Sequence, residues 1–145
     1  MLRLVSKTGS AAHVTEVLGI EPTSASEVGD PIRRTGRTFD SSRWILHGAS
    51  DIEEGVELAD SLSRLLDRVE VAGVGLWQLE GEGYWVNWLC LVGSHALEHS
   101  VELDRDSLRR LLVLPGDLWL DIYEAVPDDV TAARDRWNRR RSAGS

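Results

Sequence analysis

The sequence predicts a two-layer α+β sandwich: a mostly antiparallel sheet of four or five strands with two main helices on one face, ferredoxin-like in arrangement, plus a C-terminal helix. Apolar runs typical of strands alternate along the chain with stripes typical of amphipathic helices. The chain has 145 residues, of which 42% are apolar, which suits one domain of ordinary size. We therefore expect a single domain over residues 1–125 and a basic helical tail over residues 126–145.

Apolar spacing predicts the elements of the N-terminal half. Alternation over Leu2 to Ser6 indicates a first strand, and a helix follows over roughly Ser10 to Leu18. A second strand begins with the apolar residues Trp44 to Leu46. Ser50 or Asp51 can then cap a long amphipathic helix. The apolar stripe of that helix consists of Val56, Ala59, Leu62, Leu65, Leu66 and Val69.

The stretch from Leu18 to Arg37 is predicted to be a long loop that serves mostly as a connector. Pro22 and Pro31 each favour extended geometry in the residue before them, so a continuous helix is excluded. The loop contains candidate anion-binding residues, namely Arg33, Arg34 and Arg37. Because no phosphate-loop pattern accompanies them, a solvated loop is the favoured interpretation.

The middle of the chain is predicted to contain an irregular segment and the central strand. Gly73 and Gly75 weaken a helix over Ala72 to Glu80, which we expect to be irregular. The run from Tyr84 to Val92 is rich in aromatic and branched residues, as in a buried strand.

The C-terminal part is predicted to add a short strand, a helix and a last strand. Val101 to Leu103 alternates as a strand, and Asp104 can cap a helix that ends near residue 112. Gly116 turns the chain into a last strand over Leu118 to Tyr123. Pro127 to Arg141 is predicted as a terminal helix whose basic end suits the helix dipole, an interpretation favoured over nucleic-acid binding.

Two of the predicted strands have one apolar face and one mixed face, and the mixed faces are our candidate binding surface. A strand turns successive side chains to opposite sides of the sheet. If helices cover the apolar face, the other face carries aromatic rings beside an amide and a carboxylate. A ligand, a partner protein, a loop or the terminal helix would then cover that second face. A carboxylate buried there would need a hydrogen-bonding partner. The candidates are Trp85, Asn87, Trp119, Asp121 and Tyr123.

Charge and cysteine content limit the function classes. The net charge is -8, which disfavours a general nucleic-acid binder or an anionic-membrane binder, because both need excess Lys and Arg. No apolar run is long enough to span a membrane, and no signal peptide pattern begins the chain. The single cysteine, Cys90, cannot form an internal disulfide, so we expect a cytoplasmic protein.

One motif is formally catalytic. His95, Glu98 and His99 match the H-x-x-E-H pattern of inverted zinc peptidases, but the pattern lies between two predicted strands rather than on a helix. We interpret it as a polar turn. No serine stands in a nucleophile elbow. The sequence therefore predicts no catalytic residue, no metal and no cofactor.

A family resemblance joins several of these segments. The phrases LGIEPTSASEVGDPI, SSRWIL and VELDRDSLRRLLVLPGDLWLDIY occur in this order. Together they resemble the bacterial family catalogued as domain of unknown function 4279, over residues 1 to 125. The resemblance supports the fold and implies no activity. Some members resemble, by gene setting, immunity proteins of bacterial toxin systems.

These observations predict a non-enzymatic cytoplasmic protein-interaction module of the immunity or regulatory type. Its expected partner is another protein, such as a toxin, rather than a membrane or nucleic acid. The alternative is a small-molecule-binding domain that uses the mixed sheet face as a pocket floor. An enzyme is the third choice. A flat exposed face would favour the protein partner, and a closed pocket with convergent polar groups would favour the ligand.

Overall fold

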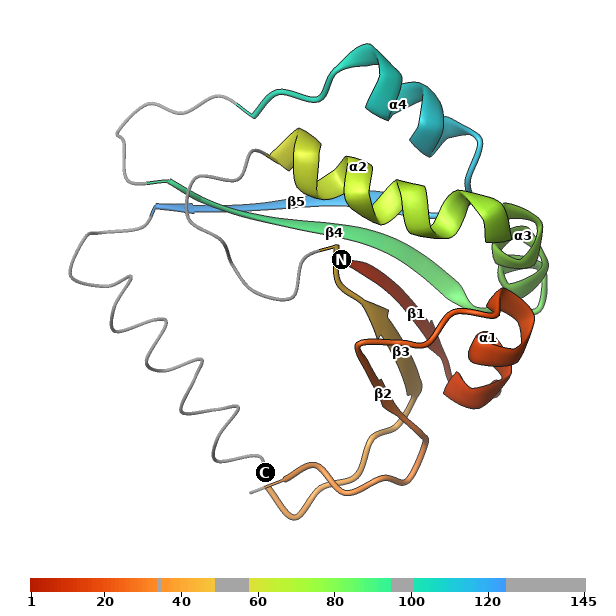
Figure 1. Cartoon of the computed structure of the whole chain (residues 1–145). Helices are drawn as coiled ribbons and strands as arrows, with labels where there is room; N and C mark the ends of the chain where they lie inside the picture. The colour runs from red at the N-terminus through yellow and green to blue at the C-terminus, as the bar shows by residue number, and fades with distance from the viewer. Residues whose placement is uncertain (34, 49–57, 95–100, 125–145) are drawn as a thin grey trace.

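The computed structural model shows a five-stranded sheet in the order β2-β3-β1-β4-β5, with helices packed on one of its faces (Figure 1). It describes residues 1–33, 35–48, 58–94 and 101–124. The strands are β1 (Leu2–Ser6), β2 (Ser24–Ser26), β3 (Ser42–Leu46), β4 (Trp85–Ser94) and β5 (Asp117–Glu124). The helices are α1 (Ala11–Leu18), α2 (Leu58–Val69), α3 (Gly73–Gly81) and α4 (Arg105–Leu112), with a 3-10 turn over Glu70–Ala72.

The predicted α+β sandwich is confirmed, and the sheet is mostly antiparallel. β1 lies in the middle and pairs antiparallel with both β3 and β4. Among the described strands only β4 and β5 run parallel, with Asn87 opposite Asp117 and Leu91 opposite Asp121. The ferredoxin-like arrangement is not confirmed. No helix within the described ranges is long and apolar enough to cross a membrane.

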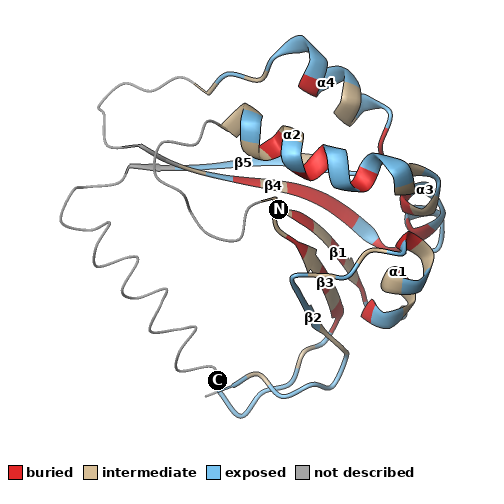
Figure 2. Ribbon diagram, viewed as in Figure 1, coloured by how far each residue is buried: buried red, intermediate tan, exposed pale blue. Residues whose placement is uncertain are grey.

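One apolar core lies between the sheet and the helices, as the buried residues of Figure 2 show. Trp44 and Trp88 are the largest fully buried side chains in it. The sheet contributes alternate apolar residues to this core, as the predicted alternation requires: Leu2 and Leu4 of β1, Trp44 and Leu46 of β3, and Val86 and Trp88 of β4. The buried side chains of α2, the helix of the long predicted stripe, are Leu62, Leu65, Leu66 and Val69. The proposed caps Ser50 and Asp51 and the stripe residue Val56 lie outside the described residues.

Helix α1 begins and ends where the sequence predicts. The Ser10 hydroxyl accepts a hydrogen bond of 3.1 Å from the His13 backbone N–H. Gly19 ends the helix with φ of 64°, in the left-handed region that glycine adopts without strain. The Glu27 carboxylate accepts from the first two backbone N–H groups of the helix, at 3.0 and 3.1 Å. The connector thus caps α1, a role that the sequence did not reveal.

The connector from residue 19 to residue 41 is more ordered than a simple loop. It contains the short strand β2, which the sequence did not predict and which pairs with β3. Beyond β2 the chain forms a hairpin tip: Pro31 bridges Thr38, and backbone hydrogen bonds of 2.9 and 3.0 Å join Gly29 and Asp30 to Phe39. The tip itself is exposed to solvent.

Trypsin is expected to cleave first at Arg33 or Arg37, whose side chains are exposed in this hairpin tip. Few apolar contacts oppose local opening there, so the peptide bonds can enter a protease site without global unfolding. Limited trypsin digestion followed by mass spectrometry measures the order of cleavage. First cleavage at Arg64 or Arg68, within helix α2, would contradict this expectation.

The segment from Ala72 to Glu80, predicted to be irregular, is the end of a 3-10 turn followed by α3, so that prediction was wrong. Leu76 and Leu79 are fully buried in α3. Gly75 permits a close approach of α1, because a Cβ at this position would lie 3.0 Å from a methyl carbon of Val17. The glycine that lowers helix propensity is therefore required by helix packing.

The predicted strand at Val101–Leu103 was also wrong: these residues have no regular structure. They belong to the connection between β4 and β5. Because parallel neighbours require a crossover, this connection passes through α4 on the helix side of the sheet. Asp104 caps α4 as predicted, accepting a hydrogen bond of 2.8 Å from the Ser107 backbone N–H.

Helix α4 is attached to the neighbouring helix by Arg110. Its guanidinium donates to the Glu70 carboxylate at 2.6 Å and to the Ser63 hydroxyl at 2.9 Å, and it also pairs with Asp67. The hydrogen bonds that Arg110 donates to the carboxylates of Glu70 and Asp67 raise the pKa of Arg110. This network holds α4 beside α2, although its partly exposed carboxylates limit how much it stabilises the fold.

Candidate functional site

The sheet face that points away from the helices carries the candidate site. We call it the open face and define it by the alternate residues of the four longer strands. Its described members are Arg3, Val5, Arg43, Ile45, Trp85, Asn87, Leu89, Leu91, Asp117, Trp119 and Asp121.

Two tryptophans form the most exposed aromatic feature of the open face. The Trp85 and Trp119 ring centroids lie 5.3 Å apart, with the planes at 64°, which is an edge-to-face pair. Trp85 is 38% exposed and Trp119 is 48% exposed. The Trp85 indole N–H donates to the Asp117 carboxylate at 3.2 Å, which fixes the ring. The parallel register of β4 and β5 sets Trp119 opposite Leu89, so the two rings meet along the strands rather than at opposed positions.

Asn87 lies beneath this exposed layer, fully buried. Its side-chain oxygen accepts a hydrogen bond of 3.0 Å from the Arg3 guanidinium, and its amide N–H donates to the Asp117 carbonyl oxygen at 3.2 Å. Asn87 therefore connects the three strands β1, β4 and β5. Because a buried amide without partners would cost stability, these two bonds explain why it is tolerated there.

Arg3 provides a positive charge beside the tryptophans. Its guanidinium carbon lies 5.0 Å from the centroid of the Trp85 ring. Partial burial lowers the pKa of Arg3, and the neighbouring charge of Arg43 lowers it further. The Arg3 Nε atom is buried without a hydrogen-bond partner in the described part of the chain. Within that part of the chain Arg3 forms no ion pair, and its guanidinium is the kind of group that pairs with an anion.

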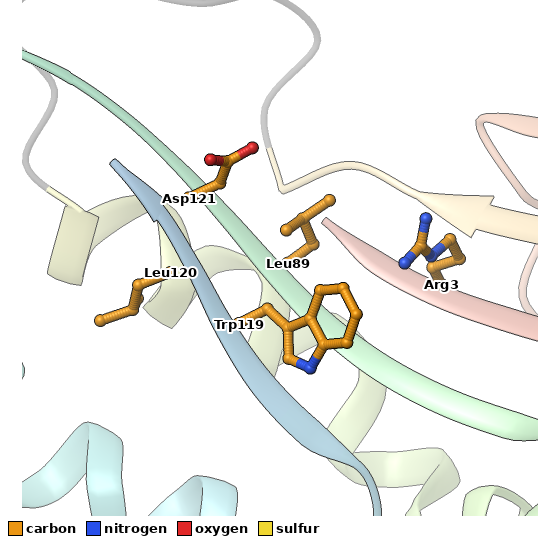
Figure 3. Close-up of a pocket in the computed structure, with 5 residues that line it drawn as sticks. All are labelled: Arg3, Leu89, Trp119, Leu120 and Asp121. Carbon is orange, nitrogen blue, oxygen red and sulfur yellow. The ribbon is translucent and has the colours of Figure 1, made fainter. Parts of the chain in front are cut away.

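A shallow hollow of about 430 Å³ lies over β4 and β5 (Figure 3). Leu89 stands between Asp121 and Arg3, with the indole of Trp119 alongside. Leu120 also borders the hollow, but its side chain points away from the other four. The hollow thus has an apolar floor with opposite charges on its two sides, and it is open to solvent.

Asp121 is exposed, so it does not need the hydrogen-bonding partner that a carboxylate buried on this face would require. The far half of β5 extends beyond the helix layer, and on the opposite face Leu120 and Ile122 are also exposed. Tyr123 lies on the same strand, at a position whose side chain is outside those described.

Asp121→Asn is expected to change the free energy of unfolding by less than about 0.5 kcal/mol, because surface substitutions without buried partners have small effects. Thermal unfolding of the variant beside the parent measures this. A loss above about 2 kcal/mol would assign Asp121 to the fold and remove it from the site.

The structure does not bring the loop arginines to this site. Arg33 and Arg37 lie in the hairpin between β2 and β3, and β2 is the sheet edge opposite β5. Arg34 and the H-x-x-E-H motif over residues 95–99 fall outside the described residues. Within the described ranges, no three His, Cys, Asp or Glu side chains gather as metal ligands would.

Sequence reasoning did not find Arg3 or Asp117, which complete the site. The available signal was a charged residue between two leucines at Leu2 and Leu4, an alternation that predicts a solvent-side position. What the sequence could not reveal is that β1 lies beside β4, since this pairing joins residues at least 80 positions apart.

Cys90 has the surroundings of an unreactive thiol. It is buried on the helix face of β4, and burial raises its pKa. A nucleophilic cysteine needs the opposite shift, toward the thiolate at neutral pH. The arrangement as a whole suits binding through rings, charges and apolar surface.

Comparison with known proteins gives one match. The family model for the domain of unknown function (DUF4279) matches residues 1–125 of this chain. The searches with this chain found no match among curated proteins and none among solved structures.

Proposed function

We propose, from the premise that the chain belongs to the DUF4279 family, that it is a non-enzymatic interaction module that binds a partner protein on its open face. The observation that carries this proposal is an exposed cluster of Trp85, Trp119 and Arg3. The two ring centroids lie 5.3 Å apart, and the guanidinium carbon of Arg3 lies 5.0 Å from the centroid of the Trp85 ring. Tryptophan, tyrosine and arginine are enriched among the few interface residues that dominate the binding energy. Contiguous exposed apolar patches on protein surfaces often mark interaction sites.

The shape of the face supports a protein partner more than a small ligand. The hollow over Leu89 is open rather than enclosed. Ligand sites are concave and bury most of the ligand surface, whereas protein interfaces are flatter. The partner that fits best carries an acidic side chain for Arg3, because this guanidinium meets no carboxylate within the described residues.

The alternative is a small-molecule site in the same hollow. Its volume of about 430 Å³ falls in the range of known ligand pockets. Arg3 and Asp121 stand on opposite sides of its apolar floor, which would suit a small molecule with a negative and a positive end. Protection against thermal unfolding by such compounds, without any protein partner, would favour this alternative.

We place the protein in the bacterial cytoplasm, as an immunity-type or regulatory protein that blocks its partner. The single cysteine and the negative net charge of -8 suit a reducing compartment and a soluble role. A toxin encoded by a neighbouring gene is the partner to test first. Cys90 is buried, and burial raises its pKa, so this thiol is a poor candidate for a nucleophile.

The proposal is tested by photocrosslinking in the native host. A photoreactive residue replaces Leu91, which is 43% exposed on the open face, or Val74, which is 87% exposed on α3. We expect a specific protein adduct from position 91 and none from position 74, identified by mass spectrometry. Equal adducts from both positions, or none from position 91, would contradict the open-face interface.

A further inference from the structure

An apolar groove lies on the helix side of the sheet, between α4 and β5. It has a volume of about 240 Å³ and is lined by Leu108, Leu111, Leu112, Leu114, Gly116 and Leu118. Beyond the groove, Leu120 and Ile122 continue the same side of β5 and are 41% and 45% exposed. The groove and the end of β5 thus form one apolar strip that the described residues leave open to solvent.

The chain itself supplies a segment that can reach this strip. Residues 125–145 follow β5 directly and lie outside the described residues. The predicted terminal helix, Pro127 to Arg141, would be about 22 Å long, and the eight residues of β5 span about 26 Å. A helix that turns back after residue 126 therefore matches the length of the strand that it would cover.

The apolar pattern of the terminal helix fits the strip. Val130, Ala133 and Trp137 recur at helical spacing and so form one narrow stripe. Most other residues between Pro127 and Arg141 are charged or polar, as on the solvent side of a surface helix. A helix with one apolar stripe and an edge strand with an uncovered apolar face can bury these surfaces against each other.

The direction of α4 fixes how the terminal helix would lie beside it. The connection from β4 returns to the start of β5, so α4 runs antiparallel to β5 (Figure 1). A helix that folds back along β5 on the same side is therefore parallel to α4. Its first turn, with Asp128 and Asp129, then lies next to the first turn of α4.

The exposed charges of α4 complement this arrangement. Arg105 and Arg109 lie one turn apart on the side of α4 that carries Leu108 and Leu112. Both arginines are exposed, and neither forms an ion pair with another described residue. They can pair with the acidic first turn of the terminal helix, which adds charge complementarity to the apolar contact.

We propose that residues 127–141 form a helix that packs in the groove between α4 and β5 and extends the helix layer over the edge strand. The short connection at residues 125–126 holds this helix near the groove at a millimolar effective concentration, which favours it over an unlinked segment. The terminal helix then lies on the side opposite the open face, which stays free for a partner protein.

Crosslinking within the full chain tests on which side the terminal helix lies. In a Cys90→Ala background, Ala133→Cys is combined with either Leu120→Cys or Asp121→Cys, and a short bismaleimide joins thiols that lie close together. Positions 120 and 121 are both exposed, but they point to opposite faces of the sheet. We expect at least about fivefold more intramolecular link with position 120 than with position 121, measured by mass spectrometry.

Several results of this crosslinking would overturn the proposal. Equal links at the two positions, more link at position 121, or no link at either would each exclude the groove as the place of the terminal helix. Links between two chains, seen as a dimer on a denaturing gel, would assign the groove to a second copy.

Thiol reactivity gives a second measurement, which needs only one cysteine. In the same background, alkylation of Leu120→Cys should become at least about fivefold faster when Trp137→Asp is added, because an aspartate cannot pack in an apolar groove. Alkylation of Asp121→Cys is the matched control and should change less than about twofold. An unchanged rate at position 120 would contradict the docking of the helix.

Neither measurement involves the partner protein of the open face. Failure of the terminal-helix docking therefore leaves the open-face proposal standing, and failure of the open-face proposal leaves the docking standing.

Discussion

Trp88→Ala is expected to lower the free energy of unfolding by about 3–5 kcal/mol. The Trp88 side chain is 2% exposed, on the helix face of β4. Its indole N–H donates a hydrogen bond of 2.9 Å to the Pro115 carbonyl oxygen. The substitution leaves a cavity in the core and removes the partner of a buried carbonyl. Domains of this size have only about 5–15 kcal/mol of stability, so the variant should be close to unfolding at physiological temperature.

Trp85→Ala is the matched control, on the same strand but on the open face. The free energy of unfolding should fall by about 1 kcal/mol in Trp85→Ala, because the ring is part of one exposed aromatic pair. Urea unfolding followed by circular dichroism measures both variants on one scale. Equal losses in the Trp85 and Trp88 variants would mean that the open face is part of the structural core.

Gly116→Ala is expected to cost about 2–5 kcal/mol, from backbone strain and overpacking together. Gly116 has a backbone φ angle of 107°, which residues that carry a side chain rarely adopt. A Cβ there would lie 2.7 Å from the Val86 carbonyl oxygen. The residue turns the chain from α4 into β5, so a shift at this point would displace Trp119 and Asp121 relative to β4.

The matched control is Gly81→Ala, at the end of α3, where a Cβ would meet no atom within 4 Å. This variant should be neutral or slightly stabilising, by about 0.5 kcal/mol, because alanine restricts the unfolded chain. Thermal unfolding of both variants beside the parent tests the difference. A Gly116 variant as stable as the Gly81 variant would contradict the tight turn into β5.

The sheet was predictable from the sequence because its longer strands each have a clear period-two pattern. In β4 the apolar residues Val86 and Trp88 alternate with Trp85 and Asn87, which decides both the strand and its two faces. α3 was not predictable, because glycine at position 75 has a low helix propensity. Gly75 is needed there because α3 packs closely against Val17 of α1, which is distant in sequence.

The candidate site was predictable only in part. Alternation placed Trp85, Trp119 and Asp121 on one face, and the parallel pairing of β4 and β5 places them on neighbouring strands. The burial of Asn87 was not predictable, because it depends on hydrogen bonds to Arg3 and to the Asp117 carbonyl oxygen. These contacts follow from the order of strands in the sheet, which alternation within one strand does not encode.

The affinity for the protein captured by the Leu91 crosslinker is the most direct test of the claim that the open face serves a partner rather than the fold. Isothermal titration calorimetry compares the affinity of the parent with the affinities of Trp85→Ala and Trp77→Ala. Trp77 is the matched control because it is an exposed tryptophan on α3. We expect Trp85→Ala to weaken binding by at least about 30-fold, as for a hot-spot residue. We expect Trp77→Ala to leave the affinity within about twofold of the parent. Unchanged affinity in the Trp85→Ala variant would mean that the open face does not bind this partner.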